Sequence, residues 1–129
     1  MKRKVILDTN ALLIPGSEGV DIFTEIQRAV SDGVEFVVME GTLKELDALQ
    51  KAGSAKEKAQ AKIAFATLAK KSIKILSHKI PVVDDAIVGE ASRGDIVATM
   101  DRDLKQRLKQ KGVDVAVLRQ RSYIVIVEA

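Results

Sequence analysis

The pattern of apolar and polar positions along the chain predicts strands and helices in alternation. Short apolar runs rich in β-branched residues are typical of buried strands, and they occupy residues 5–7, 34–39, 73–76, 95–100, 113–118 and 123–127. Helical spacing of apolar residues marks most of the segments between them, at residues 21–31, 42–51, 55–72, 82–92 and 102–111. This alternation favours an α/β fold with a central, mainly parallel sheet.

Composition narrows the class of protein. The chain has 129 residues, 47% of them hydrophobic, and we expect a single domain over residues 1–129. It contains no Cys and one His, His78, so the sequence offers little to a zinc site. No apolar run approaches the roughly 20 residues of a membrane span. We therefore expect a cytoplasmic protein with no membrane partner.

Positive charge is concentrated in one segment of the chain. Residues 51–79 contain eight Lys and a single acid, Glu57, whereas the rest of the chain carries a net negative charge. The simpler interpretation of such a run is a solvated, Lys-rich helix face. The same division of charge also suits an anionic polymer that one patch holds while an acidic pocket acts on it.

Two acids come directly after predicted strands. Asp8 follows the apolar run at residues 5–7, and Asp101 follows the run at 95–100, with Asp103 two residues further on. Ligands of such folds gather beyond the carboxyl ends of the strands. A carboxylate at that rim is costly unless a helix N-terminus, a Lys or Arg, or a cation compensates its charge.

Further acids lie at the start of, or within, predicted helices. Glu45 is one turn before Leu49 in the 42–51 segment, where its side chain could point back at the rim of the sheet. Asp85 begins the 82–92 segment, and its neighbour Asp84 competes for the same role. The sequence alone decides neither where the Glu45 side chain points nor which of Asp84 and Asp85 belongs to the site.

Helix capping and metal binding compete as explanations of the acids. Capping is the simpler one for Asp101 and for Asp84 or Asp85. It suits Asp8 poorly, because the residues after Asp8 break at Pro15 and offer only a short turn to cap.

Taken together, the acids favour a metal site. Acids at strand ends and helix starts, without His or Cys, form the ligand set that Mg²⁺ or Mn²⁺ prefers. In that case Asn10 and Thr99 are either ordinary rim residues or groups that orient the acids.

The acids and their surroundings resemble, in order, the four acidic motifs of the PIN-domain nuclease family. The matching stretches are VILDTNALL with Asp8, TLKELDAL with Glu45, DDAIVGEA with Asp85 and IVATMDRDLKQRL with Asp101. The resemblance covers nearly the whole chain. It implies a PIN-like three-layer α/β/α sandwich around a central, mainly parallel sheet of about five strands.

The resemblance also implies a site and a reaction. Asp8, Glu45, Asp85 and Asp101 match the core acids of the family, and Asp103 matches an accessory acid of many members. These residues would bind Mg²⁺ or Mn²⁺, and the four core acids would serve the hydrolysis of RNA by metal-activated water. The family often forms homodimers.

Two branches of the family compete. The stretch VATMDRDLKQRL and the strand after it look similar to archaeal and eukaryotic PIN proteins of ribosomal RNA processing. The compact single-domain form is equally similar to VapC-type toxins, for which the resemblance implies an antitoxin partner.

RNA binding is expected to rest on basic residues near the acids and in the Lys-rich segment. The candidates for phosphate contacts are Arg102, Lys105, Lys56, Lys58 and Lys62. The alternative from another class is a PIN-like RNA-binding or ribosome-assembly factor that does not cleave. The presence of all four acids argues against it, because a pure binder has little reason to gather like charges in one pocket.

Overall fold

Six strands form one sheet at the centre of the computed structural model, which describes residues 2–129. They are β1 (Arg3–Leu7), β2 (Val34–Met39), β3 (Lys74–Leu76), β4 (Ile96–Ala98), β5 (Asp114–Arg119) and β6 (Tyr123–Val127). Their order across the sheet is β3-β2-β1-β4-β5-β6, and every neighbouring pair is parallel except β5 and β6. The expected mainly parallel sheet is confirmed, with six strands in place of about five.

Seven helices connect the strands within the described residues. They are α1 (Thr9–Leu12), α2 (Ile14–Glu18), α3 (Ile22–Ala29), α4 (Glu40–Ala52), α5 (Ala55–Ala69), α6 (Val83–Glu90) and α7 (Arg102–Lys111). A capping box between Ser54 and Glu57 begins α5, because each side chain bonds the backbone N–H of the other. No helix in the described part of the chain is long and apolar enough to cross a membrane.

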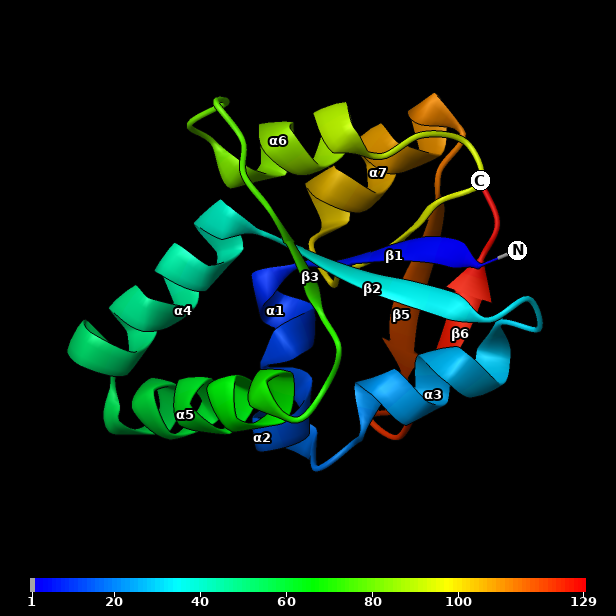
Figure 1. Cartoon of the computed structure of the whole chain (residues 1–129). Helices are drawn as coiled ribbons and strands as arrows, with labels where there is room; N and C mark the ends of the chain where they lie inside the picture. The colour runs from blue at the N-terminus through cyan, green and yellow to red at the C-terminus, as the bar shows by residue number, and fades with distance from the viewer. Residues whose placement is uncertain (1) are drawn as a thin grey trace.

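The helices lie on both faces of the sheet and complete three layers (Figure 1). Helices α1 to α5 pack on one face, over a core that includes Val5 and Leu7. Helices α6 and α7 pack on the other face, over a core that includes Ile6 and Val97. Because successive residues of β1 enter opposite cores, the strand is apolar without alternation, as the sequence shows.

The strand order places the ends of β1 and β4 side by side. The chain reaches β3 at one edge of the sheet and then returns to β4, which pairs with β1 on the side away from β2. Leu7 pairs with Ala98 at the carboxyl ends of the two strands. This reversal of strand order is where α/β sheets form ligand crevices, and Asp8 and Asp101 follow directly.

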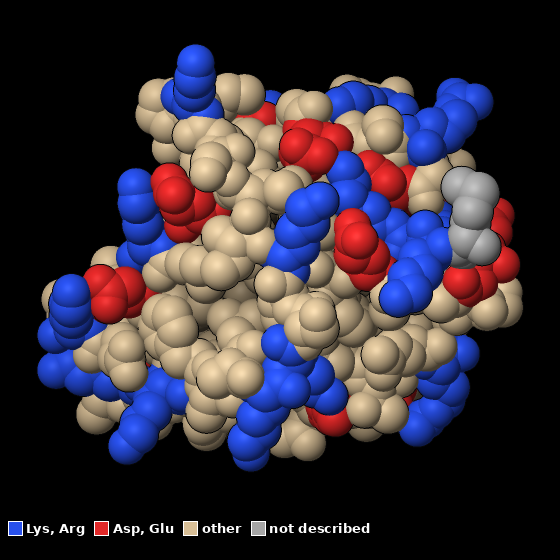
Figure 2. All heavy atoms as spheres, viewed as in Figure 1, with Lys and Arg blue, Asp and Glu red and all other residues tan. Residues whose placement is uncertain are grey.

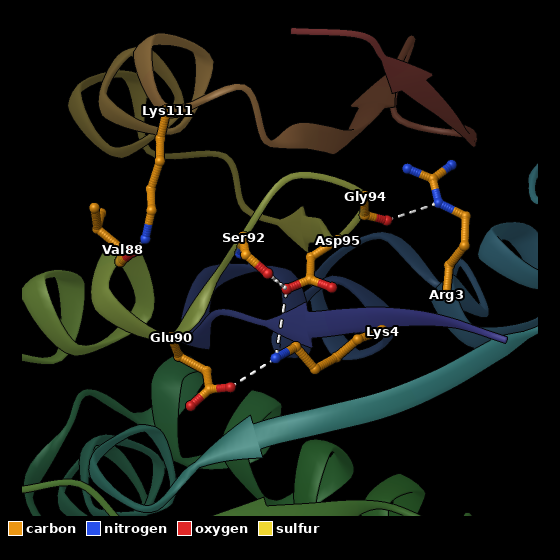
Figure 3. Close-up of polar contacts among 8 residues, drawn as sticks. All are labelled: Arg3, Lys4, Val88, Glu90, Ser92, Gly94, Asp95 and Lys111. Carbon is orange, nitrogen blue, oxygen red and sulfur yellow. Dashed lines mark hydrogen bonds and ion pairs between the residues drawn. The ribbon is translucent and has the colours of Figure 1, made fainter.

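Polar contacts hold the opposite end of the sheet together (Figure 3). Lys4 of β1 donates to Glu90 at 2.6 Å and lies 3.4 Å from a carboxylate oxygen of Asp95. Burial lowers the pKa of Lys4, but its bonds to these acids and their charges outweigh the burial and raise it. Arg3 donates to the carbonyl oxygen of Gly94 at 3.0 Å. These contacts bind the end of α6 and the loop that connects it to β4 to the central strand β1.

Candidate active site

Asp8 lies at the end of β1 with almost no contact with solvent, since the residue is 4% exposed. Its Oδ1 accepts a hydrogen bond from the backbone N–H of Thr9 at 2.8 Å, and its Oδ2 accepts one from the hydroxyl of Thr99 at 2.8 Å. Asp8 is therefore the N-cap of the four-residue α1. The sequence argument against capping was wrong here, although the cap reaches only the first N–H of a very short helix.

Thr99 and Asn10 join the segment after β1 to the segment after β4. The buried Thr99 hydroxyl donates to Asp8 and accepts the backbone N–H of Asp101 at 3.1 Å. The side-chain oxygen of Asn10 accepts the backbone N–H of Met100 at 2.9 Å. These bonds hold Asp8 and the backbone of Asp101 in a fixed relation.

Asp101 begins α7. Its Oδ1 accepts the backbone N–H of Leu104 at 2.8 Å, which makes Asp101 the N-cap of that helix, as the capping explanation predicted. The bond uses one carboxylate oxygen and fixes the side chain at the carboxyl end of the sheet. Asp103 lies exposed in the first turn of the same helix.

Glu45 reaches the site from α4. Its Oε1 accepts a hydrogen bond from the hydroxyl of Thr9 at 2.6 Å, so the first residue of α1 connects it to the end of β1. Glu45 is exposed to solvent. Its side chain therefore points back to the rim of the sheet, in the direction that the spacing from Leu49 suggested.

Of the two acids at the start of α6, Asp84 interacts with the other site acids. Burial raises the pKa of Asp84 most, and the charges of Asp101 and Glu45 raise it further. Asp85, which the family motif favours, forms an ion pair with Arg107 of α7 at 2.8 Å. Neither residue is the N-cap of α6, because that position is Val82.

Four carboxylates thus form one electrostatic group at the carboxyl end of the sheet. This acid cluster consists of Asp8, Glu45, Asp84 and Asp101. Burial raises the pKa of Asp8 to about 6, and the charges of Asp84 and Glu45 add to the rise, against the hydrogen bonds from Thr99 and Thr9, which lower it. The fold therefore holds Asp8 where its negative charge is poorly compensated by its surroundings.

His78 connects two of the elements that carry the cluster, a role that no sequence pattern signalled. Its Nε2 accepts the backbone N–H of Gly41 at 2.9 Å, and its Nδ1 lies 2.7 Å from the carbonyl oxygen of Ile80. Because a carbonyl only accepts, we assign the ring proton to Nδ1. The ring connects the loop before α6 to the first turn of α4, across 37 residues of sequence.

The expected RNA-binding residues lie on both sides of the sheet. Three are exposed lysines of α5, namely Lys56, Lys58 and Lys62. Figure 2 shows basic side chains gathered along this helix. Arg102 and Lys105 lie on α7, which belongs to the opposite layer. Arg102 follows Asp101 directly and so lies beside the acid cluster, whereas α5 reaches the cluster's surroundings at its first turn, where Glu57 lines the same hollow as Glu45 and Thr9.

The acid cluster has the ligand chemistry of a hard divalent cation. Its donors are carboxylate oxygens, and Asp8 forms no ion pair with a Lys or Arg within residues 2–129. In the described part of the chain, no three Asp, Glu, His or Cys side chains are grouped closely enough to hold one ion as they stand. By charge and by ligand type, the cluster nevertheless fits Mg²⁺ or Mn²⁺.

The fold and the acid cluster define an α/β domain of the PIN type, and comparison with known proteins agrees. A family model described as a PIN like domain matches residues 5–121. Ribonuclease VapC4 of Methanocaldococcus jannaschii is 30% identical to this chain over 125 residues, which cover 95% of each protein. The chain belongs to the PIN-domain family.

Solved structures show the same fold. The PIN domain endonuclease Utp24 superposes with a TM-score of 0.76 at 23% identity, covering 98% of this chain and 92% of that one. A domain of a functionally unknown protein from Methanocaldococcus jannaschii superposes with a TM-score of 0.57 at 18% identity, covering 91% of each chain. At these identities the likeness concerns the fold alone.

Proposed function

We propose that the protein is an endoribonuclease that depends on Mg²⁺ or Mn²⁺ and hydrolyses RNA phosphodiester bonds. The observation that carries the proposal is the acid cluster, in which a buried carboxylate, Asp8, lies among other acids at the carboxyl end of the sheet. A group of acids whose negative charge is not compensated destabilises the fold, and such groups are typical of functional sites. The 30% identity to Ribonuclease VapC4 supports RNA as the substrate.

Each acid of the cluster has a proposed role. Asp8 and Asp101 are the metal ligands that the backbone holds most firmly, through the bonds to Thr9 and Leu104. Asp84 is a further ligand in place of Asp85, because Arg107 occupies Asp85. When bound, a divalent cation would activate water and stabilise the charge of the leaving oxygen.

The remaining side chains act around these ligands. Glu45, held by the Thr9 hydroxyl, is placed to orient the attacking water or to bind the cation through water. Asp103 is an accessory acid on the first turn of α7. Thr99 and Asn10 keep Asp8 and Asp101 in register through their hydrogen bonds.

RNA would be held by the cations on either side of the site. Arg102 and Lys105 lie along α7 beside the cluster and would bind phosphates next to the scissile bond. The α5 lysines would bind phosphates farther along the strand. We further propose a cytoplasmic homodimer, acting either as a VapC-type toxin with an antitoxin partner or as an RNA-processing enzyme.

A PIN-like RNA-binding or assembly factor that does not cleave is the second candidate. The ion pair between Asp85 and Arg107 favours it to a degree, because it engages one acid of the family motif. Asp84 supplies a carboxylate in its place, since its pKa responds to Asp101 and Glu45. The two functions differ in one measurable property, which is cleavage.

Cleavage of a mixed RNA pool tests the proposal. We expect cleavage with Mg²⁺ or Mn²⁺, none with EDTA, and recovery when the metal is restored. Asp8→Asn and Asp84→Asn should each abolish cleavage, whereas Asp32→Asn, an exposed acid in the loop before β2, should not change it. Equal cleavage with and without EDTA would refute metal dependence, and RNA binding without cleavage under every condition would establish the binding factor.

A further inference from the structure

The sheet face that carries α6 and α7 ends in exposed apolar side chains at β6. Ile124 and Ile126 of β6 pack into the core under α3, on the opposite face. Because side chains alternate along a strand, Tyr123 and Val127 point to the α7 side, where they are 39% and 40% exposed. In Figure 1, α6 and α7 lie together on one side of the sheet and α3 lies on the other. Val125, between Tyr123 and Val127 on the same face, is half-buried against the core under α6 and α7, so this layer leaves the last strand partly uncovered.

A groove of about 400 Å³ runs between α7 and this partly uncovered edge. Val115 and Val117 of β5 form its floor, where both are already buried in the core, and the half-exposed Val127 of β6 forms its open side. The groove is therefore aliphatic from its floor to Val127, which is the residue that carries apolar surface out to solvent. Such a surface is stabilised when another apolar face covers it.

Four cations surround the groove. Arg102, Lys105 and Lys109 are spaced by three and four residues on one side of α7, and Arg119 lies at the end of β5. None of the four forms an ion pair within residues 2–129. Glu128 is the one acid among the described residues that line the groove. The groove thus combines an apolar floor with a strongly positive rim.

We propose that this groove binds an amphipathic helix of a partner protein, with an aliphatic face and an acidic flank. The helix would lie beside α7 over β6, as a third helix on that face of the sheet. Its aliphatic side chains would cover Val127 and rest on the floor that Val115 and Val117 form. Its acids would pair with the cations of α7 and with Arg119, which gives the pairing both specificity and a fast encounter.

The floor and the rim together favour this occupant over three others. RNA would bind the cations, but no described residue that lines the groove is aromatic, and Tyr123 lies outside it, so the groove offers RNA bases no ring to stack on. A second copy of the chain, related by a two-fold axis, would bring the same cations close to themselves. A strand added to the edge of β6 would lie in the plane of the sheet, away from the cations of α7.

One consequence rests on the proposed function. Arg102 and Lys105 line the groove and are also the proposed phosphate ligands beside the acid cluster. A helix in the groove would therefore compete with RNA. Peptide binding to the groove and displacement of RNA by the peptide are measured separately. The proposed groove and the proposed function can therefore fail independently of each other.

Binding of a designed peptide to the full chain tests the proposal. The probe is a stapled helix of about 15 residues, a length at which an unstapled helix is marginal in water, with Leu on one face and Glu along one flank. We expect it to shift the valine methyl resonances of the groove. Lys109→Glu combined with Arg119→Glu should weaken binding about tenfold or more. Val127→Glu should weaken it similarly.

Matched controls separate the groove from general charge. Lys70→Glu combined with Lys74→Glu makes the same change in net charge at the other edge of the sheet, around β3, and it should alter affinity by no more than about twofold. A peptide with Lys in place of Glu should not bind. Folding of every variant is checked by circular dichroism.

Other outcomes would overturn the proposal. These are an absence of methyl shifts, equal weakening by the control pair, shifts of these methyls by single-stranded RNA alone, or self-association lost in Val127→Glu. Shifts confined to the backbone amides of β6 would indicate strand addition and would also overturn it. Peptide binding without displacement of RNA would support the groove and contradict only the phosphate role of Arg102 and Lys105.

Discussion

At the scale of single residues, the buried carboxylate of Asp8 lowers the stability of the metal-free protein at the position where the proposed reaction needs a negative charge. The folded protein holds its pKa near 6, above the ordinary value of 3.8, chiefly through burial. Between these two values the folded state binds more protons than the unfolded chain, so the stability of the metal-free protein falls as the pH rises through this window. At pH 7 the cost is on the order of 3 kcal/mol.

The first prediction is that Asp8→Asn stabilises the metal-free protein at pH 7, by about 1–3 kcal/mol. In the variant, the amide nitrogen of Asn can take the place of Oδ2 and donate a hydrogen bond to the Thr99 hydroxyl. That hydroxyl can then donate to the nearby side-chain oxygen of Asn10. Below pH 4 the two proteins should be equally stable, because Asp8 is then protonated in the parent. Urea unfolding at both pH values decides it, and a loss of stability at pH 7 would show that Asp8 supports the fold.

Asp101 combines two roles that two substitutions separate. Asn is as good an N-cap as Asp, whereas Ala is not. We expect Asp101→Asn to keep the parent's stability and Asp101→Ala to lose about 1 kcal/mol, while both lose cleavage. Melting curves and RNA cleavage on the same samples make the test. If Asp101→Asn still cleaves RNA, Asp101 is only the cap of α7.

At the scale of elements, the site depends on how closely α4 and α6 begin beside each other. A Cβ added at Gly41 of α4 would lie 2.6 Å from Cγ2 of Val83 and 2.9 Å from Nε2 of His78. The absence of a side chain at Gly41 therefore permits both the packing of the two helix starts and the hydrogen bond to His78.

Gly41→Ala should destabilise the protein by about 1–3 kcal/mol, even though Ala is the better helix former, because the added methyl group overpacks this contact. Gly89→Ala in α6 is the matched control, since its Cβ would lie 3.4 Å from Cδ1 of Ile80. We expect the control to be neutral or stabilising by up to about 1 kcal/mol. Chemical unfolding of both variants checks the pair, and equal effects would contradict the contact.

The elements also show what the sequence can predict. The apolar runs gave all six strands because strands buried on both faces need continuous apolar residues. The segment after Asp8 was expected to be only a short turn, whereas it forms α1 and α2, with Pro15 in the first turn of α2, where proline is tolerated.

The roles of the other site residues depend on contacts with residues that are distant in the sequence. The sequence placed Asp8 and Asp101 at one rim because their positions directly after strands are local information, and it allowed Glu45 to point to the same rim. It could not choose between Asp84 and Asp85, because the choice depends on Arg107, which comes from another helix. The hydrogen bond between His78 and Gly41 was missed for the same reason.

At the scale of the whole molecule, positive charge lies on both faces of the sheet and the acid cluster lies at the carboxyl end of its central strands. An RNA strand that reaches the cluster from either side would meet cations. The α5 set and the α7 set belong to opposite layers, and only the α7 set begins at the residue directly after Asp101.

The two sets should therefore differ in effect. Changing Lys56, Lys58 and Lys62 to Gln should weaken RNA binding and reduce the slope of log K against log salt by about 2, while cleavage of saturating RNA continues. Changing Arg102 and Lys105 to Gln should lower the cleavage rate as well. Binding isotherms over a salt series test this, and an unchanged slope in the triple variant would mean that α5 presents only a solvated face.

The central claim is that the acid cluster binds the metal, and line broadening by Mn²⁺ in NMR spectra tests it most directly. Paramagnetic Mn²⁺ added below equimolar amounts should first broaden the backbone amides around Asp8 and Asp101, including those of Asn10 and Met100. Excess Mg²⁺ should restore these signals, and Asp8→Asn should prevent the effect while Asp32→Asn does not. Broadening that begins at other acids, or that persists in Asp8→Asn, would contradict the account.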